Sequence, residues 1–203
     1  MPHLYIVAGP NGAGKSLFSA ELTTTDFEVF DGDKHMAELK AKYPETGSDS
    51  LENFVNEGIF KSAKEKAIAA NGNFAFETNF SAEDPLYSMR AFKAAGYKIH
   101  LVFMGMNSVE ECIQRVSIRV KAGGHKVSEE AINYNYMAGY ANLCKYFKEF
   151  DTVTLYDNAI PADSEMSIPE KVFYWENGKI MFTAENLPHW VQKFIKSVKK
   201  SIL

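Results

Sequence analysis

The sequence has only two cysteines, Cys112 and Cys144, among its 203 residues. Two cysteines cannot form the disulfide framework that stabilises small secreted domains. Neither of them has a Cys, His or Asp neighbour at the spacing of a metal site. We therefore expect both to be buried free thiols.

The chain also lacks a long hydrophobic run and a strong excess of charge of one sign. No segment approaches the roughly 18 apolar residues of a membrane span, and no basic segment precedes the apolar stretch Leu4 to Ala8, so we expect a cytoplasmic protein without a signal peptide. The formal net charge is −4. Because phosphate neutralisation needs a basic surface, this balance argues against binding to nucleic acid.

Short apolar runs alternate with longer segments of helical periodicity along most of the chain. The runs typical of buried strands are His3 to Ala8, Glu28 to Asp31, Asn73 to Thr78, Lys98 to Met104 and Thr152 to Tyr156. Helical spacing occurs over Lys15 to Leu22, Leu51 to Ala70, Asp84 to Ala95, Val109 to Lys121 and Glu129 to Lys148. This alternation predicts an α/β fold in which a mostly parallel sheet carries helices on both faces.

The pattern changes near the end of the chain. Lys171 to Trp175 and Lys179 to Thr183 flank Glu176-Asn177-Gly178, and an Asn-Gly pair between two such runs predicts a tight β-hairpin. Leu187 to Ser201 then has the spacing of a closing helix. Because no repeat or linker interrupts the chain, we expect one domain over residues 1–203, with the hairpin and helix as an extension over about 165–203.

The clearest motif directly follows the first expected strand. It reads Gly9-Pro10-Asn11-Gly12-Ala13-Gly14-Lys15-Ser16, which fits the pattern of a phosphate-binding loop. Glycines let backbone N–H groups surround a triphosphate, and the N-terminus of the next helix adds the positive end of its dipole. We expect this loop and Leu17 to bind a nucleotide, with Lys15 on the β and γ oxygens and Ser16 on Mg²⁺.

Phosphoryl transfer also requires a carboxylate that accepts the proton of the attacking hydroxyl, and candidates follow the expected strands. Asp33 is the first candidate for this base, although it could instead cap a helix that starts near Lys34. Asp31 is the alternative base, or it orients the turn. Glu77 closes a buried strand, where a carboxylate must be solvated, paired or bound, so we expect it to contact metal-bound water or a substrate hydroxyl.

A third group of residues lies between Val109 and Asn142. Arg115 and Arg119 are four residues apart on one expected helix, so both can reach over the same face towards a triphosphate. The alternative is ordinary surface pairing with Glu110 or Glu111. Gly123-Gly124-His125 follows them and is typical of a mobile lid segment, in which His125 either contacts the ligand or is a simple loop residue.

Together these residues resemble the zeta toxin family of P-loop kinases over residues 4 to about 158. The matching segments, in the order and spacing of the family, are Gly9 to Ser16, Asp31-Gly32-Asp33, Glu77-Thr78-Asn79-Phe80-Ser81, Arg115 to Val120, Gly123 to Val127, Asn142-Leu143 and Tyr156-Asp157-Asn158.

The resemblance implies an enzyme that uses ATP and Mg²⁺ to phosphorylate a sugar hydroxyl of UDP-N-acetylglucosamine or a related small molecule. Some members of this family act as toxins with antitoxin partners. The roles that it implies are phosphate binding for Lys15, Mg²⁺ binding for Ser16, the base for Asp33, substrate or metal contact for Glu77, substrate contact for Thr78 and His125, and lid charges for Arg115 and Arg119.

The sequence departs from the family in the segment after Gly-Gly-His. Similar sequences carry an Arg-Arg-Tyr run where this chain has Tyr134-Asn135-Tyr136, and Ser128 stands where proline is usual. The loss of two positive charges weakens the expected grip on the γ-phosphate or on an anionic substrate.

Two other functions fit the same phosphate-binding loop. One is a kinase of nucleotides or nucleic-acid ends, which a basic groove would favour. The other is an ATP-binding switch that has no acceptor chemistry. The sequence contains no Asn-Lys-x-Asp guanine signature, and this absence favours ATP in every case.

Overall fold

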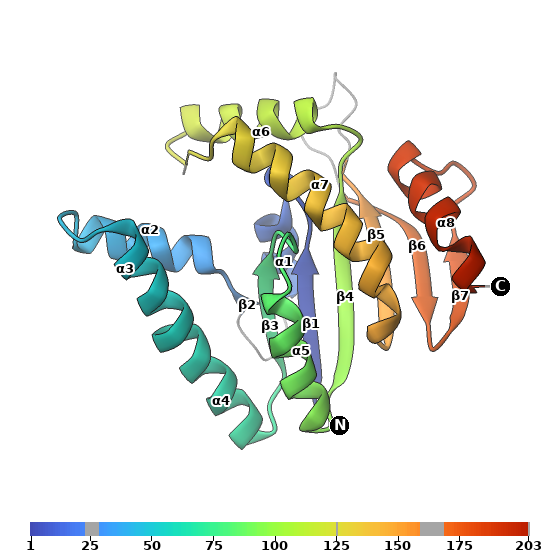
Figure 1. Cartoon of the computed structure of the whole chain (residues 1–203), viewed down its shortest axis with the longest axis horizontal. Coiled ribbons are helices and arrows are strands. Elements are labelled where there is room, and N and C mark those ends of the chain that lie inside the picture. The colour runs from blue at the N-terminus through green and yellow to red at the C-terminus, as the bar shows by residue number, and fades with distance from the viewer. Residues whose placement is uncertain (23–28, 125, 159–168, 203) are drawn as a thin grey trace.

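The structure, a computed structural model, describes residues 1–22, 29–124, 126–158 and 169–202. These residues form one seven-stranded sheet with helices packed around it (Figure 1). The strands are β1 (His3–Ala8), β2 (Val29–Phe30), β3 (Phe74–Thr78), β4 (Lys98–Gly105), β5 (Thr152–Asp157), β6 (Glu170–Glu176) and β7 (Lys179–Thr183). The helices are α1 (Lys15–Leu22), α2 (Gly32–Lys42), α3 (Ser48–Asn53), η1 (Phe54–Phe60), α4 (Lys61–Ala70), α5 (Asp84–Ala94), α6 (Val109–Lys121), α7 (Glu129–Tyr146), η2 (Phe147–Glu149) and α8 (His189–Ile202).

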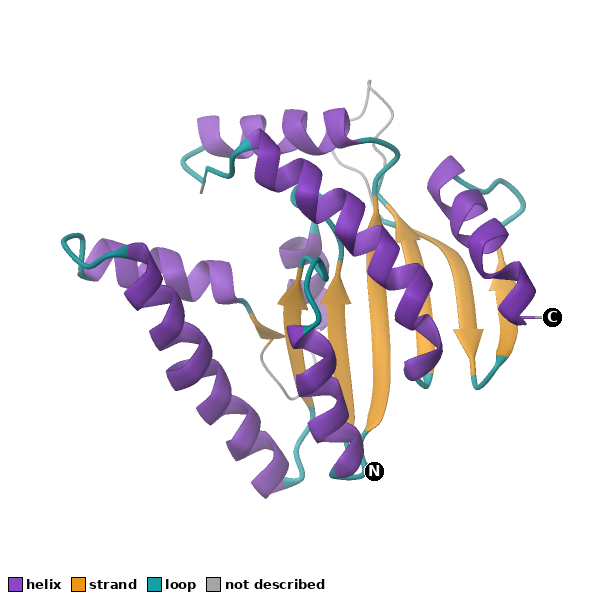
Figure 2. Cartoon of the chain, in the orientation of Figure 1, coloured by secondary structure: helices purple, strands orange, loops and turns teal. Residues whose placement is uncertain are grey.

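The strand order is β2-β3-β1-β4-β5-β6-β7. The first five strands along the chain pair in parallel, and β6 and β7 extend the sheet as an antiparallel hairpin (Figure 2). Asn177 and Gly178 at the tip have positive φ angles of 47° and 86°. Two left-handed residues in a two-residue loop match the twist of paired strands, so the predicted hairpin is confirmed.

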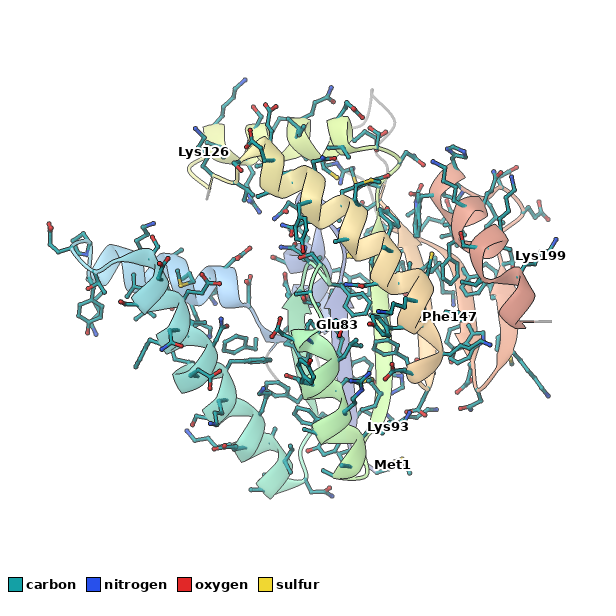
Figure 3. All side chains as sticks on the ribbon, viewed as in Figure 1. Met1, Glu83, Lys93, Lys126, Phe147 and Lys199 are labelled. Carbon is teal, nitrogen blue, oxygen red and sulfur yellow. The ribbon has the colours of Figure 1, made fainter. Side chains whose placement is uncertain are left out.

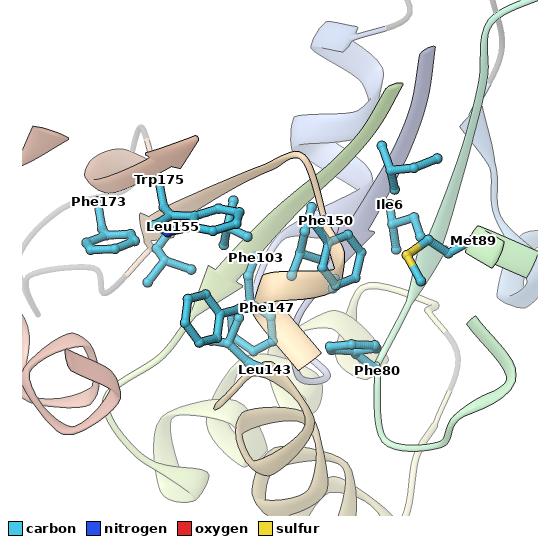
Figure 4. Close-up of a cluster of buried hydrophobic side chains, with 14 of the residues drawn as sticks. Ile6, Phe80, Met89, Phe103, Leu143, Phe147, Phe150, Leu155, Phe173 and Trp175 are labelled. Carbon is cyan, nitrogen blue, oxygen red and sulfur yellow. The ribbon is translucent and has the colours of Figure 1, made fainter. Parts of the chain in front are cut away.

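Side chains alternate between the two faces of the sheet and so fill two cores. On β1, Leu4 and Ile6 belong to the larger core, which contains side chains of α5, α7 and α8 (Figure 4). Val7 points to the other face, where it packs with residues of α6 and with Phe18 of α1. Phe103 at the centre of β4 is fully buried. Burial of such a ring contributes about 1.5–3 kcal/mol, so the sheet and its helices form a stable platform for the loops at its edge.

The final helix packs beside the carboxyl end of the parallel strands. The indole of Trp190 donates to Asp157 Oδ1 at 2.9 Å, and a Cβ atom on Gly105 would lie 2.3 Å from the same ring. Val191 and Phe194 are buried, whereas Lys199 is exposed on the outer surface (Figure 3). In the described part of the chain, no helix has the length and apolar character needed to cross a bilayer.

The single helix expected over Leu51 to Ala70 is longer and less regular in the structure. It begins at Ser48 and runs through α3, the π-helix η1 and α4. Over seven residues, π-helical and α-helical hydrophobic patterns differ too little for sequence spacing to separate them. A π-helix is rare and frequently marks a functional site, which gives this segment an importance that the sequence did not predict.

Candidate functional site

The phosphate-binding loop connects β1 to α1, as the sequence predicts, and its glycines meet specific steric demands. Gly9 has a φ of 145°, and a Cβ atom there would lie 2.2 Å from the Met104 carbonyl oxygen of β4. Gly14 has a φ of 84°, and its Cβ would lie 2.4 Å from Nδ2 of Asn158. These positions combine left-handed backbone with close neighbours, so only glycine keeps the loop in this shape.

Lys15 folds back onto the loop that precedes it. Its ammonium donates to the carbonyl oxygens of Gly9 at 2.7 Å and Pro10 at 3.1 Å, and to Asn79 Oδ1 at 3.0 Å. Burial lowers the pKa of Lys15, while the carboxylates of Glu77 and Asp33 act in the opposite direction. The ammonium therefore lies where phosphate oxygens could replace its present carbonyl partners.

Ser16 joins two carboxylates, one in β3 and one directly after β2. Its hydroxyl donates to Glu77 Oε2 at 3.0 Å, and Asp31 Oδ2 lies 3.4 Å away. Burial raises the pKa of Glu77, and the nearby charge of Asp31 raises it further. Two carboxylates and a hydroxyl are a suitable partial set of ligands for Mg²⁺, which takes its remaining oxygens from phosphates and water. Ser16 and Glu77 were predicted as metal ligands, and the carboxylate of Asp31 lies beside them.

The structure separates the roles of the two aspartates near the start of α2. Asp31 is the N-cap, because its Oδ1 accepts a hydrogen bond from the Lys34 backbone N–H at 3.2 Å. Asp33 is not the cap that the sequence allowed, since it lies within the first turn of the helix. Its side chain is exposed and lines a cavity of about 280 Å³ between α2 and the α3–η1 segment.

Arg115 supports the phosphate-binding loop from the side of α6. Its guanidinium donates to the Gly12 carbonyl oxygen at 3.3 Å and to the carbonyl oxygen of Asn158. The Asn158 side chain completes this connection, because its Nδ2 donates to the Ala13 carbonyl oxygen at 2.8 Å. These contacts fix the outer wall of the loop. The alternative prediction from the sequence was that Arg115 pairs with Glu110 or Glu111 at the surface.

Arg119 lies one turn further along the same helix. Its positive charge contributes to lowering the pKa of Lys15, although burial of Lys15 is the main cause. The Gly124 backbone N–H donates to the Arg119 carbonyl oxygen at 2.9 Å, and a Cβ on Gly124 would lie 2.6 Å from the Arg119 side chain. Gly124 therefore lets the chain fold back against Arg119. His125, the predicted ligand contact, lies outside the described residues.

The segment after β3, which carries part of the family resemblance, contributes two residues to which the sequence analysis assigned no role. Asn79 binds the Lys15 ammonium, and Phe80 is fully buried with a φ of 56°. The Phe80 backbone N–H donates to Thr78 Oγ1 at 3.0 Å, and its carbonyl oxygen accepts from Asn142. A bulky residue held in left-handed backbone is typical of functional loops. The family resemblance marked this segment, but hydrophobic periodicity alone does not separate it from an ordinary strand end.

Two residues of the segment Tyr134-Asn135-Tyr136, where the sequence departs from the family pattern, make hydrogen bonds in the structure. Asn135 Nδ2 donates to Asn11 Oδ1 of the phosphate-binding loop at 2.8 Å. Tyr136 donates through its hydroxyl to the Asn107 carbonyl oxygen at 3.1 Å. The start of α7 therefore reaches the loop through a neutral amide where an arginine was expected.

The two cysteines differ in burial. Cys112 is fully buried in the same apolar cluster as Ala13, and burial raises the pKa of its thiol to about 12. Its carbonyl oxygen would lie 3.1 Å from a Cβ on Gly12. Cys144 on α7 is only half-buried, so the expectation of two buried free thiols is confirmed for Cys112 alone.

A second, larger cavity of about 510 Å³ opens between the α3–η1–α4 segment and the start of α5. It shares Gly32 and Asn56 with the smaller cavity that contains Asp33. Glu77 and Thr78 at the end of β3 also line it, so it meets the Ser16 site. The predicted substrate residues Asp33, Glu77 and Thr78 therefore line two neighbouring cavities, of which the larger adjoins the Ser16 site.

Comparisons with known proteins point to one family. The sequence model described as Zeta toxin matches residues 1–162. An uncharacterized protein of Haemophilus influenzae is 29% identical over 129 residues, which cover 63% of this chain and 88% of that protein.

Among solved structures, the PezAT toxin-antitoxin system of Streptococcus pneumoniae superposes with a TM-score of 0.62 at 16% identity, over 98% of this chain and 87% of that one. The AvrRxo1-ORF1:-ORF2 complex with ATP superposes with a TM-score of 0.65 at 13% identity, over 97% of this chain and 63% of that one. These two likenesses establish a common fold.

Proposed function

Because the chain belongs to the zeta toxin family, we propose that it is an ATP-dependent kinase that transfers the γ-phosphoryl group to a hydroxyl of a small-molecule acceptor. One observation carries this proposal. Ser16 at the end of the phosphate-binding loop contacts Glu77, Glu77 lines the larger cavity, and that cavity shares Gly32 and Asn56 with the cavity of Asp33, so nucleotide, metal and acceptor could meet at one sheet edge. Family membership makes a nucleotide sugar such as UDP-N-acetylglucosamine the first acceptor to test.

The nucleotide would bind where Lys15 now contacts its own loop. Loop N–H groups and the N-terminus of α1 would face the phosphates, and the ammonium would exchange the Gly9 and Pro10 carbonyls for phosphate oxygens. This exchange replaces neutral acceptors with charged ones, which form stronger hydrogen bonds with an ammonium.

Ser16, Asp31 and Glu77 would hold Mg²⁺. The bound ion would neutralise negative charge on the β and γ oxygens of the nucleotide. For the chain itself, this assignment explains why a partly buried carboxylate such as Glu77 lies beside another carboxylate at the edge of the sheet.

Asp33 is the group that we assign as the base. It lines the smaller cavity from the first turn of α2, and its charge acts on Lys15, which supports a position near the phosphate site. Asp31 is committed to the Lys34 cap and to Ser16, and Glu77 is committed to Ser16. This division leaves Asp33 to accept the proton of the acceptor hydroxyl.

We further propose that the chain has an antitoxin partner. The support is family membership together with the likeness to the PezAT toxin-antitoxin system.

The Asp33→Asn substitution tests the proposed chemistry. Loss of a general base lowers the rate by about 10² to 10⁴, so acceptor phosphorylation should fall by at least about a hundredfold. ATP affinity and Tm should stay close to those of the native chain, because Asp33 is exposed and is not the N-cap. Transfer of ³²P from ATP to acceptor pools measures the first effect, and calorimetry measures the others.

Asp49→Asn is the matched control, since Asp49 occupies the first turn of the neighbouring helix α3 and is also exposed. It should behave like the native chain. Native-rate phosphorylation by Asp33→Asn would remove Asp33 from the chemistry. If the native chain binds ATP but phosphorylates no acceptor in a broad screen, the ATP-binding switch is the correct function.

A further inference from the structure

We infer that one face of α7, the stripe formed by Asn135, Gly139 and Asn142, positions both parts of the phosphate site. These residues are four and three positions apart, so the helical repeat places them on the same side of the helix. Asn135 contacts the phosphate-binding loop, and the other two contact the segment after β3 that carries Asn79, a partner of Lys15. The inference deepens the proposed function and rests on its nucleotide site.

The first contact of the stripe fixes a side chain within the phosphate-binding loop. Asn135 Nδ2 donates to Asn11 Oδ1 at 2.8 Å, and Asn11 is only 5% exposed. A buried amide oxygen is costly to leave without a donor, so this bond opposes any movement of Asn11 away from α7. Asn11 directly follows Pro10, whose carbonyl oxygen accepts a hydrogen bond from Lys15. The bond therefore holds the loop next to the lysine site.

The second part of the stripe holds the segment after β3. Asn142 Nδ2 donates to the Phe80 carbonyl oxygen at 2.9 Å. Gly139 is buried against the neighbouring peptide, since a Cβ atom there would lie 2.8 Å from the Asn79 carbonyl oxygen. A backbone oxygen cannot turn aside as the end of a flexible side chain can. Glycine at this position therefore lets α7 lie close to the segment.

The backbone of this segment requires such a support. Phe80 has a left-handed φ of 56°, which is an unfavourable conformation for a bulky residue unless its surroundings hold it there. Its N–H donates to Thr78 Oγ1 at 3.0 Å, and its carbonyl oxygen is the group that Asn142 binds. Because Phe80 is held at both its N–H and its carbonyl, the position of the preceding residue, Asn79, is fixed as well.

The side chain of Asn79 connects this support to Lys15. An ammonium has three donors, and those of Lys15 go to the carbonyl oxygens of Gly9 and Pro10 and to Asn79 Oδ1. When phosphates replace the two loop carbonyls, the bond to Asn79 would remain and would direct the other two donors towards the nucleotide. Asn79 is a neutral acceptor, so it orients the ammonium without cancelling its charge.

A neighbouring face of α7 anchors the helix to the sheet. The Tyr140 hydroxyl donates to the Met106 carbonyl oxygen and accepts from the Met106 N–H, both at 2.8 Å, directly after β4. The Tyr136 hydroxyl donates to the Asn107 carbonyl oxygen at 3.1 Å. The stripe therefore belongs to a helix that is fixed at the end of a central strand, so two loops that are distant in sequence share one support.

Nucleotide binding to single variants provides the first test. Isothermal titration calorimetry with Mg²⁺ and a non-hydrolysable ATP analogue should give at least about threefold weaker binding for Asn135→Ala and for Asn142→Ala, because each loses one hydrogen bond. Asn133→Ala is the matched control, since Asn133 is an exposed asparagine on the opposite face of the same helix. The control should bind like the native chain. Native affinity in both stripe variants overturns the inference.

A double-mutant cycle tests whether Asn135 acts through Asn11. Asn11→Ala and Asn135→Ala remove the same hydrogen bond, so their effects on the Kd should not multiply. The double variant should bind at most about twofold more weakly than the more affected single variant. Multiplied effects would mean that the two side chains act independently, and they would overturn this connection.

Gly139→Ala separates positioning from a role in the stability of the helix alone. Alanine is a better helix former than glycine, so a purely structural role predicts unchanged or tighter binding of the ATP analogue. Positioning predicts at least about tenfold weaker binding, because the added methyl group meets the Asn79 carbonyl oxygen. Circular dichroism shows whether the variant is folded, and the two asparagine variants keep the test decisive if it is not.

These binding measurements need no acceptor, so they separate the inference from the proposed function. A native chain that binds ATP but transfers no ³²P to any acceptor contradicts the kinase, and the positioning role stands if the stripe variants bind more weakly. Native ATP affinity in the stripe variants of a chain that does phosphorylate an acceptor supports the kinase and overturns the positioning role.

Discussion

The two arginines of α6 have different surroundings, and this difference predicts different effects of their removal. Arg115 holds the Gly12 and Asn158 carbonyls, whereas the charge of Arg119 acts on Lys15. An arginine that stabilises the transferred phosphoryl group can contribute about 10³ to 10⁵ in rate. We therefore expect Arg119→Ala to lower kcat by at least about 10³ with little change in ATP affinity.

Arg115→Ala should instead weaken ATP binding and lower Tm, because the loop loses a lateral support with two hydrogen bonds. Steady-state kinetics and calorimetry on both variants separate the two effects. Small and equal effects from both substitutions would show that neither arginine acts on the phosphates or on the loop.

Lys15→Ala should abolish the use of ATP while leaving the fold intact. The ammonium bonds to loop carbonyls and to Asn79, and it fills no part of the apolar core. Ala is also the best helix former, so α1 should persist. Isothermal titration calorimetry should detect at least about tenfold weaker ATP binding, whereas Lys196→Ala on the exposed face of α8 should bind normally. Native affinity in Lys15→Ala would refute the phosphate-loop assignment.

The place of an individual residue in the site could be predicted where a sequence motif specifies both the residue type and its position in the fold. Lys15 and Ser16 lie as expected because the motif sets their place between strand and helix. The contributions of Asn79 and Asn158 could not be predicted, since each depends on contact between segments that are distant in the chain. Asp31 and Asp33 are two residues apart, and only the structure shows that the first is the cap.

A histidine pair on the sheet predicts how stability depends on pH. His3 Nδ1 lies 2.8 Å from His100 Nε2, and His100 Nδ1 lies 2.7 Å from Thr152 Oγ1. Burial, helped by the charge of His3, lowers the pKa of His100 from 6.5 to about 4. The fold therefore favours neutral His100, so its contribution to stability is complete above pH 6.5 and is lost as the pH falls towards 4.

The loss amounts to as much as about 3 kcal/mol, because each pKa unit corresponds to about 1.4 kcal/mol. Urea unfolding at several pH values between 7 and 4 measures it. His100→Gln should have a shallower dependence, and His189→Gln at the exposed start of α8 should keep the native one. A native slope in His100→Gln would assign the effect to other groups.

Most strands and helices were predictable because their hydrophobic periods are long and are bounded by glycines. β1, α1 and α6 begin and end at the expected residues. The α2 helix lacked such a signal, since it contains no fully buried residue and so has no clear apolar period. The π-helix η1 was missed because the hydrophobic patterns of π- and α-helices differ too little over its seven residues.

Binding of Mg²⁺ and ATP should stabilise the whole molecule more strongly as the pH rises. Burial and Asp31 raise the pKa of Glu77 above its ordinary value of 4.5, so protons compete with Mg²⁺ for this carboxylate in mildly acidic solution. Without ligand, the same shift favours the protonated folded state, and that contribution declines with increasing pH.

Thermal unfolding at saturating ATP, with and without Mg²⁺, measures this linkage between pH 5 and 7. A ligand at 100 times its Kd adds about 2.7 kcal/mol, which is readily detected. Glu77→Gln should lose both the metal effect and its pH dependence, while Glu65→Gln on α4 should retain them. A metal effect that does not vary with pH in the native chain would place Mg²⁺ elsewhere.

The topology of the whole sheet explains why the candidate site residues lie at one edge. Five parallel strands direct their carboxyl ends to the same side, so loops that follow β1, β2 and β3 meet although they are far apart in sequence. The sequence predicted this α/β arrangement from alternation alone. The strand order and the position of the acceptor cavities depend on packing between helices, for which the hydrophobic pattern contains no information.

Because Cys112 is buried, the reactivity of its thiol reports local opening of the structure around it. Its thiol lies in one apolar cluster with Ala13 of the phosphate-binding loop, so an alkylating reagent reaches it only when this cluster opens. The labelling rate of Cys112 therefore measures how often the cluster around the loop opens, and we expect a nucleotide bound to the loop to slow it. Cys144, which lines a separate groove between α7 and α8, serves as the internal reference for openings that the nucleotide does not control.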